Sequence, residues 1–342
     1  MFKFKKKSVV GISISPELGL EIAEVNFPER RICKYTRTPL AYDYVQKNIS
    51  DIDIFKEHLQ ELLLELAIPK GADIVLNVPS AFFEIKDYPA SLTNEQIGLA
   101  IEESLNSVPI FSKAEPIYSY AQVPIETMQF NRYVYAAVNK TTILEIALFI
   151  EELGYNIINI DVSVNSILNA LVYNNRIDLG SNKLWTLLII DNSSCRILTM
   201  QDSNYVETFE EPISIGEVLG DEENYATVLS AIGPILDKTP TERLYILSNT
   251  SLICASKLAQ SINFPGQIIH QDVNSFATET YLEIEEDSID SNLAKTMSLE
   301  VIGAAVKREL QDQTIKINLF NHLLGDLYFR SQPPEIIINN KK

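Results

Sequence analysis

The sequence repeats one order of elements in its two halves, and this repeat limits the possible fold more than any other feature. Each half opens with three short segments that mix apolar and polar residues, a pattern typical of strands. They lie near Val9–Ser15, Leu20–Asn26 and Ile32–Thr36 in the first half, and near Leu184–Ile190, Cys195–Gln201 and Tyr205–Phe209 in the second. The chain therefore contains an internal duplication.

A helix and a further strand follow each group of three strands. In the first half, apolar residues recur at helical spacing from Phe55 to Leu66 after a capping-box pattern at Ser50 and Asp53, and Asp73–Val78 has the pattern of a buried strand. In the second half, a helix around Tyr225 precedes a strand at 244–247. Alternating strands and helices require parallel strands with helices packed on them. The predicted fold class is α/β, with a ribonuclease-H-like lobe used twice.

Residues 80–150 interrupt the first repeat with an α/β pattern of their own. Thr93 and Gln96 form a capping box before an apolar helical face, and Thr142–Leu153 has the pattern of a second helix, ended by Gly154. A long closing helix is expected at Leu293–Leu310. We therefore predict a first lobe (1–79 and 151–178), an inserted α/β subdomain (80–150), a second lobe (183–312) and a C-terminal segment (313–342).

The net negative charge of the chain argues against nucleic acid as a partner. The 342 residues carry a net charge of −18 and the pI is near 4.6, so a nucleic-acid backbone would be repelled. One basic cluster, at Lys3, Lys5, Lys6 and Lys7, is interleaved with Phe2 and Phe4. It is either a solvated tail or a contact for anionic lipid headgroups at the inner membrane.

Composition also predicts a cytoplasmic protein. No apolar stretch approaches the ~20 residues that span a bilayer, and the basic start is not followed by the apolar region of a secretory signal. Cys33, Cys195 and Cys254 are widely separated, which indicates neither a disulfide framework nor a zinc site. His58 and Glu61 give a single ligand pair rather than a metal site, and no histidine and acid accompany the serine-rich turns as a hydrolase triad requires.

Several short motifs stand in an order that is typical of one family. They are Met1–Lys7 before Val9-Val10-Gly11-Ile12, Asn77-Val78-Pro79-Ser80, Glu102-Glu103 with Val108-Pro109-Ile110, Leu153-Gly154-Tyr155 through Asp161, and Val301-Ile302-Gly303-Ala304-Ala305. Together they resemble the PilM family of actin-like type IV pilus assembly proteins, including its divergent MshI-like branch. The resemblance covers nearly the whole chain. It implies an actin-like fold that binds ATP with magnesium between its two lobes.

The residues that such a nucleotide site needs are altered at the first phosphate loop. Where the family has Gly-Ile-Asp-Ile-Gly, this chain has Gly11, Ile12, Ser13, Ile14 and Ser15. The acid that helps to hold magnesium is lost, and so is the glycine that lets backbone N–H groups approach phosphate. The Pro16-Glu17 pair that follows removes a donor and adds a repelling charge.

The other two loops depart from the family in the same way. The second phosphate loop is Asp191, Asn192, Ser193 and Ser194, with serine where glycine is typical, and Asn249, Thr250 and Ser251 replace a glycine run at the adenosine loop. Asp191 can position magnesium, or it can simply close a strand and cap a turn. These residues are candidates for a degenerate nucleotide site, and the prediction is that the chain is not an enzyme.

The C-terminal segment carries a possible partner signal at Ile317, Asn318, Leu319 and Phe320. The resemblance implies a partner, the membrane protein PilN, with a cytoplasmic Ile-Asn-Leu segment that docks into a groove of PilM. A similar segment within this chain can dock on its own surface or on a neighbour, or it can be an ordinary last strand.

The sequence therefore predicts a cytoplasmic actin-like scaffold at the inner-membrane platform of a type IV pilus or a related type II secretion-like machine. It would act by binding PilN-like and other membrane partners. The alternative is a working actin-like ATPase of the same machine, with Ser13, Ser15, Asp191 and Ser193 as an unusual phosphate cradle. A third hypothesis is a filament-forming cell-division actin homologue, which needs an amphipathic, basic membrane helix at the C-terminus; Asp326 and Pro333-Pro334 disfavour it.

Overall fold

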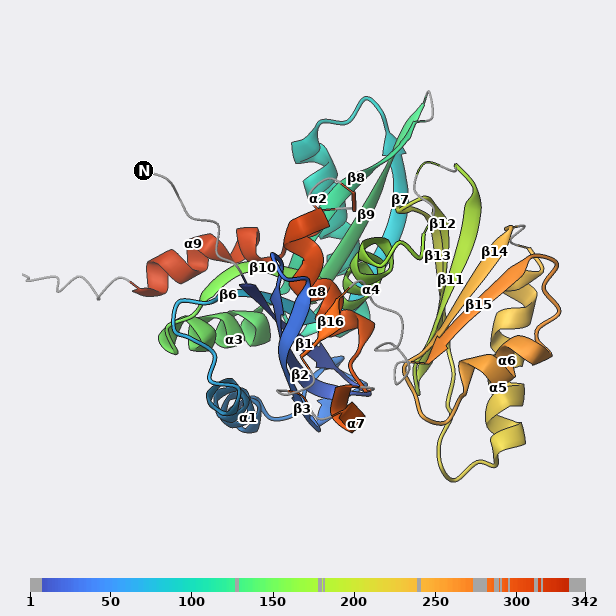
Figure 1. The fold of residues 1–342 in the computed structure, drawn as a ribbon. Coiled ribbons are helices and arrows are strands. Elements are labelled where there is room, and N and C mark those ends of the chain that lie inside the picture. The colour runs from blue at the N-terminus through green and yellow to red at the C-terminus, as the bar shows by residue number, and fades with distance from the viewer. Residues whose placement is uncertain are drawn as a thin grey trace, which may run out of the picture.

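Two sheets and a smaller third sheet organise the molecule (Figure 1). The computed structural model describes residues 8–126, 129–177, 180, 182–238, 241–272, 282–285, 289, 291–294, 296–310, 313–314 and 316–331. The basic cluster at Lys3–Lys7 lies outside the described residues. No helix among the described residues is both long and apolar enough to cross a bilayer.

The first sheet contains the strands predicted for the first lobe. Its order is β10-β6-β1-β2-β3-β16, in which β1 to β3 are antiparallel and β6 and β10 run parallel to β1. The strands are β1 (Ser8–Ser15), β2 (Gly19–Asn26), β3 (Arg31–Thr38), β6 (Asp73–Val78), β10 (Asn156–Val162) and β16 (Glu283–Ile284). Apolar residues of β1 and β2 are almost fully buried because helices cover both faces of this sheet.

The second sheet has the same design, which confirms the duplication. Its order is β13-β12-β11-β14-β15, again with three antiparallel strands followed by two parallel ones. The strands are β11 (Leu184–Ile190), β12 (Ser194–Gln201), β13 (Asn204–Pro212), β14 (Arg243–Ser248) and β15 (Gln267–Asp272). In both sheets the first strand is therefore central, and the turns that follow it and the late parallel strand meet at one edge.

The first sheet is covered by α1 (Ile52–Glu65) and α3 (Lys140–Glu152) as one pair and by α4 (Ser163–Tyr173) and α8 (Leu299–Leu310) as another. The predicted capping box at Ser50 and Asp53 is wrong. The Asp51 side chain caps α1 instead, accepting hydrogen bonds from the backbone N–H groups of Asp53 and Ile54. All three residues favour a cap, so composition alone did not select among them.

The inserted subdomain is smaller than expected. Its sheet has the order β7-β9-β8, built from β7 (Phe82–Pro89), β8 (Pro116–Glu126) and β9 (Phe130–Asn139), with α2 (Asn94–Asn106) and the short 3-10 helix η1 (Pro109–Ser112) beside it. The capping box at Thr93 and Gln96 is present. Helix α3 was assigned to residues 80–150 of the insertion, but its apolar face packs in the core of the first lobe, against β10 and α1.

In the described part of the second lobe, two helices cover its outer face. Helices α5 (Asp221–Leu236) and α6 (Ala255–Ser261) pack there with a hydrophobic cluster that includes Leu188, Ile190 and Ile246. The inner face, with Leu187, Ile189 and Met200, joins the large cluster of the first lobe, which contains the apolar residues of α4. Because the two lobes share one continuous apolar core, they are not independent units.

The C-terminal elements return to the first lobe. Residues 183–312 were assigned to the second lobe, but α8 packs on α4 and on β1, and β16 pairs with β3 (Figure 1). The long helix expected at 293–310 is instead α7 (Ser291–Ala294) followed by α8. Close approach fixes α8 in place, since a side chain at Gly303 would overlap the Ser166 carbonyl oxygen of α4, and one at Gly11 would overlap the Val301 carbonyl oxygen.

Candidate functional site

Three loops meet between the lobes, at the edge where the central strands end. The first loop begins at Ser15, the last residue of β1, and continues with Pro16 and Glu17. The turn after β11 carries Asp191 to Ser193, and the loop after β14 runs from Asn249 to Cys254. They are the three loops that the sequence predicted. Two cavities lie among them, one of about 90 Å³ and one of about 1060 Å³.

Glu17 bridges the first two loops. Its carboxylate accepts a hydrogen bond from the backbone N–H of Asn192 at 3.1 Å and another from the Asn192 side-chain amide at 2.6 Å. The hydroxyl of Tyr44, which follows the small strand β4 (Tyr42–Asp43), donates to the same carboxylate at 2.9 Å. The Glu17 carboxylate of the first loop therefore occupies the backbone N–H of Asn192, which the second loop could otherwise donate to a bound anion.

The third loop is satisfied by the second one. The Asn249 amide donates to Asp191 Oδ1 at 2.9 Å, and the Thr250 hydroxyl donates to Asn192 Oδ1 at 2.6 Å. The Ser248 hydroxyl bonds within its own loop, to the Thr250 and Ile253 carbonyl oxygens. Polar side chains therefore hydrogen-bond the second loop to the third. Glycines at these positions would leave the backbone of both loops accessible to a ligand.

Buried acids surround this junction. Burial, followed by the nearby Asp191 charge, raises the pKa of Glu17, and burial raises the pKa of Asp191 itself. Glu300, in the first turn of α8, is also buried, and its pKa is raised to about 8 by burial and by the charges of Asp191 and Glu21. The Ser13 hydroxyl donates to Glu300 at 3.5 Å. Three carboxyl groups that resist further negative charge thus face the place where a phosphate would lie.

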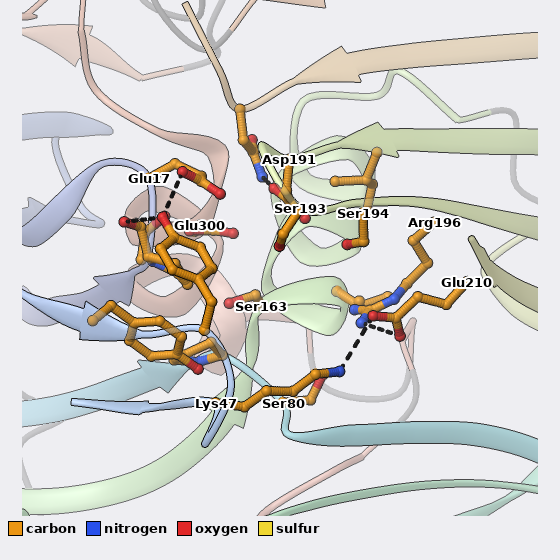
Figure 2. Close-up of a pocket in the computed structure, with 18 of the residues that line it drawn as sticks. Glu17, Lys47, Ser80, Ser163, Asp191, Ser193, Ser194, Arg196, Glu210 and Glu300 are labelled. Atoms are coloured by element: carbon orange, nitrogen blue, oxygen red, sulfur yellow. Dashed lines mark hydrogen bonds and ion pairs between the residues drawn. The ribbon is translucent and has the colours of Figure 1, made fainter. Parts of the chain in front are cut away.

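A second polar contact across the lobes lines the smaller cavity (Figure 2). Lys47, in the turn before the small strand β5 (Asn48–Ile49), reaches Glu210 of β13 at 3.3 Å, and Arg196 of β12 donates to the same carboxylate at 2.8 Å. Arg196 and Lys47 hold the pKa of Glu210 below its usual range in spite of burial. The two cations of this cavity are therefore already paired with an acid of the chain.

The candidate residues predicted from sequence divide into three groups by position. Ser15, Asp191, Asn192, Ser193, Asn249, Thr250 and Ser251 line one or both cavities, and Ser194 lines the smaller one. Ser13 is buried beneath them, between Asn77 and Glu300. Gly11 lies in the middle of β1 under α8, where it allows two backbones to pack closely.

The C-terminal candidates, Ile317 to Phe320, dock on the chain's own first lobe and insertion. The docked segment, residues 316–320, runs between β10, which is an edge strand, and β8. The Asn318 side chain accepts from the Ile160 N–H at 3.1 Å, and the Leu319 N–H donates to the Ile160 carbonyl oxygen at 2.9 Å. Ile317 and Leu319 are fully buried. The segment therefore blocks the free edge of β10 without forming a strand.

A buried ion pair supports the docked segment. Lys307 of α8 lies 2.5 Å from the carboxylate of Asp161, at the end of β10, and it donates to the Ile317 carbonyl oxygen at 2.6 Å. Sequence analysis did not single out Lys307, Glu300 or the role of Glu17. The available signal was a charged residue inside or beside an apolar run, which shows that a partner is needed but does not identify it.

The donor set does not suit magnesium. Asp191 is the carboxylate that the second loop contributes, and it is occupied by Asn249. Among the described residues, no group of three or more His, Cys, Asp or Glu side chains is placed to hold a metal ion. The resemblance implied magnesium with ATP, and the residues present at this junction do not fit that pair.

Comparison with solved structures finds the same architecture elsewhere. A PilM–PilN type IV pilus biogenesis complex aligns with a TM-score of 0.61 and 14% identity, over 87% of this chain and 98% of that one. A Bacteroides thetaiotaomicron protein with an actin-like ATPase fold aligns with a TM-score of 0.44 and 12% identity, over 79% and 94% of the two chains. The cytoplasmic domain of EpsL, an inner-membrane component of the Vibrio cholerae type II secretion system, gives 0.43 and 9%, over 94% and 98%.

The likeness to the PilM–PilN complex shows the fold. No protein-family model matches the chain, and no curated protein matches its sequence. The chain has the actin-like fold, as the sequence predicted, with an α/β insertion in the first lobe.

Proposed function

We propose that this protein is an actin-like scaffold at the cytoplasmic face of a bacterial inner membrane, in the assembly platform of a type IV pilus or a related secretion machine. It binds the cytoplasmic segment of a PilN-like membrane protein and does not turn over ATP. The likeness to the PilM–PilN complex supports both the assignment to a type IV pilus platform and the choice of a PilN-like partner. The order of family motifs, which the MshI-like branch shares, agrees with it.

The proposal that the protein does not turn over ATP rests mainly on one observation. The carboxylate of Glu17 accepts a hydrogen bond from the Asn192 backbone N–H. A phosphate would have to displace this carboxylate and then lie beside Asp191 and Glu300. Both steps are unfavourable. The displaced carboxylate loses its hydrogen bonds to Asn192, and the burial that raises the pKa of Asp191 and of Glu300 also disfavours any added negative charge beside them. The site therefore keeps the three loops of a nucleotide cleft but lacks the free donors that would bind phosphate.

Contacts between the lobes make nucleotide unnecessary for closure. Besides Glu17 with Asn192, the Arg132 guanidinium of β9 donates to the Val206 carbonyl oxygen of β13 at 2.9 Å, and Tyr205 of β13 bonds Asn165 of α4. A scaffold benefits from such fixed geometry, since a rigid surface binds its partners at a lower entropy cost.

We expect no saturable heat when ATP with magnesium is titrated into the protein at millimolar ligand. Isothermal calorimetry measures this directly, and a Kd in the micromolar range would overturn the degenerate site. Glu17→Gln serves as the matched variant, because it keeps the side-chain shape and removes the charge. Weak binding gained by Glu17→Gln alone would identify that carboxylate as the block.

The alternative function is nucleotide binding without the usual phosphate loops. The 1060 Å³ cavity favours it, because the volume is sufficient for a nucleotide-sized ligand and residues 248–254 line it where the resemblance places adenosine. The same titration separates the two functions. The filament hypothesis is not proposed, since Phe320, Leu323 and Leu327 of α9 (Phe320–Ser331) are buried, and the helix packs against β10 and α3 rather than offering an apolar face to lipid.

We predict that the docked segment covers the surface between β10 and β8 and so competes with a partner peptide for it. Asn318→Ala should raise the affinity for a peptide of the partner's cytoplasmic segment by roughly tenfold, because the peptide's asparagine can supply the acceptor that Ile160 N–H then lacks. Fluorescence anisotropy with a labelled peptide measures the change. Asn106→Ala, which makes the same chemical change at an exposed position at the end of α2, is the control. Deleting residues 314–342 should act in the same direction, and unchanged affinity in both variants would remove the masking idea.

A further inference from the structure

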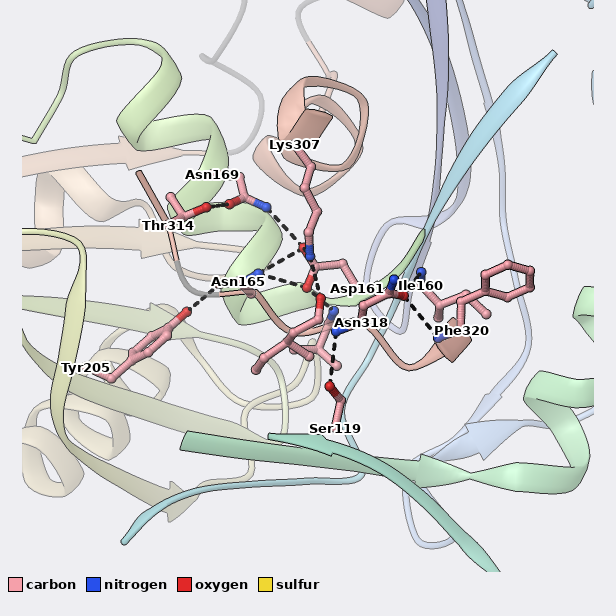
Figure 3. A network of polar contacts seen from close by, with 12 residues as sticks. Ser119, Ile160, Asp161, Asn165, Asn169, Tyr205, Lys307, Thr314, Asn318 and Phe320 are labelled. Carbon is pink, nitrogen blue, oxygen red and sulfur yellow. Dashed lines mark hydrogen bonds and ion pairs between the residues drawn. The ribbon is translucent and has the colours of Figure 1, made fainter. Parts of the chain in front are cut away.

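A buried polar network joins the docked segment to the second lobe (Figure 3). Its centre is Asp161, a fully buried carboxylate at the end of β10. Asp161 accepts from Lys307 at 2.5 Å, from the Asn169 amide at 3.0 Å and from the Asn165 amide at 2.9 and 3.0 Å. A buried carboxylate is stable only while such donors stay in place, so the positions of these groups depend on one another.

Two members of the network hold the C-terminal residues. Lys307 donates to the Ile317 carbonyl oxygen at 2.6 Å as well as to Asp161. The hydroxyl of Thr314 donates to the Asn169 side-chain oxygen at 2.7 Å. If the docked segment leaves together with Thr314, Lys307 and Asn169 each lose a partner, and the donors around Asp161 must rearrange.

Another member holds the second lobe. The Asn165 amide nitrogen faces Asp161, while its oxygen accepts from the hydroxyl of Tyr205, on β13, at 3.2 Å. Tyr205 is fully buried, and its ring packs edge-on against Phe83 of β7 at 5.4 Å between centroids. A shift of Asn165 therefore leaves a buried hydroxyl unpaired at the junction of the second lobe with the insertion.

We propose that docking of segment 316–320 and the seating of the second lobe on α4 are coupled through Asp161, Asn165 and Tyr205. Docking stabilises one arrangement of the donors around Asp161, and that arrangement presents the Asn165 oxygen to Tyr205. Coupling of this kind is reciprocal, so loosening either end loosens the other. The coupling does not depend on a partner protein and stands if the proposed function is wrong.

Hydrogen exchange of the full-length protein, followed by NMR, tests the coupling from the lobe side. Tyr205→Phe removes only the hydroxyl at the far end of the network. We expect exchange at the amides of Ile160 and Leu319, which are the donors of the bonds between β10 and the docked segment, to accelerate at least fivefold relative to amides in β11 and β14. Tyr225→Phe is the matched control, because its hydroxyl bonds Cys254 in the second lobe, outside the network.

The test from the segment side uses Thr314→Val, which keeps the shape of the side chain and removes its bond to Asn169. Amides of β13 should then exchange faster relative to those of β14. Unchanged rates at Ile160 and Leu319 in Tyr205→Phe, or acceleration that is uniform over the protein, would overturn the coupling. If Tyr205→Phe does not fold, the Thr314→Val result decides alone.

Discussion

Replacing Glu300 with glutamine is expected to raise the free energy of unfolding by up to about 4 to 5 kcal/mol at pH 8.5 and by less than about 1 kcal/mol at pH 5. The carboxyl group has a pKa of about 8 in the folded protein, against 4.5 for an ordinary glutamate. Between these values the folded state binds more protons than the unfolded state. The stability of the natural protein therefore falls as the pH rises through this window, and the loss is complete above pH 8.

Glutamine removes the ionisation while keeping the size of the side chain, so the variant should lack this pH dependence. Urea unfolding of both proteins at pH 5, 7 and 8.5 measures the difference. Glu103→Gln, on the exposed side of α2, controls for the loss of one negative charge from an acidic protein. A difference between Glu300→Gln and the natural protein that is the same at all three pH values would contradict the explanation.

Gly303→Ala is expected to lower the free energy of unfolding by about 3 kcal/mol or more. The added methyl group would overlap the carbonyl oxygen of Ser166, which belongs to the backbone of α4 and cannot turn aside. Helix α8 would have to move away from α4 and from β1, which it also covers. Thermal and urea unfolding, with circular dichroism to confirm that helices remain, measure the loss.

The matched control for that substitution is Gly98→Ala in α2. A side chain at Gly98 lies 3.6 Å from the Tyr120 hydroxyl oxygen, an ordinary contact distance, so the change should stabilise the protein by roughly 0.5 to 1 kcal/mol through helix propensity. Opposite signs for the same chemical change would attribute the cost at Gly303 to the helix crossing. Equal effects at the two sites would exclude that cause.

The strands and most helices were predictable because each leaves a local pattern. Apolar segments at 9–15 and 184–190 give β1 and β11, and the sequence alone indicated their equivalence. Thr93 with Gln96 gave the start of α2. At α1, by contrast, Ser50, Asp51 and Asp53 all suit a helix start, and only the backbone conformation selects Asp51.

The partners of buried surfaces were not predictable from such patterns. The apolar face of 299–310 shows that α8 is buried but not which sheet it covers, and the same is true of α3. Glu17 was expected to repel phosphate, whereas the structure shows it bonded to Asn192, 175 positions away in the sequence. Contacts of this range depend on the assembled fold, which periodicity does not encode.

The return of α8 to the first lobe also determines the order in which the molecule can be assembled during synthesis. The second sheet lies within residues 184–272, so all its strands have been made before α8 begins. Strand β1 must wait for Val301 and its neighbours to cover Gly11, a delay on the order of tens of seconds at ribosomal rates. The lobe that is translated first is therefore the last to close, and its apolar strands are exposed to chaperones and to aggregation in the meantime.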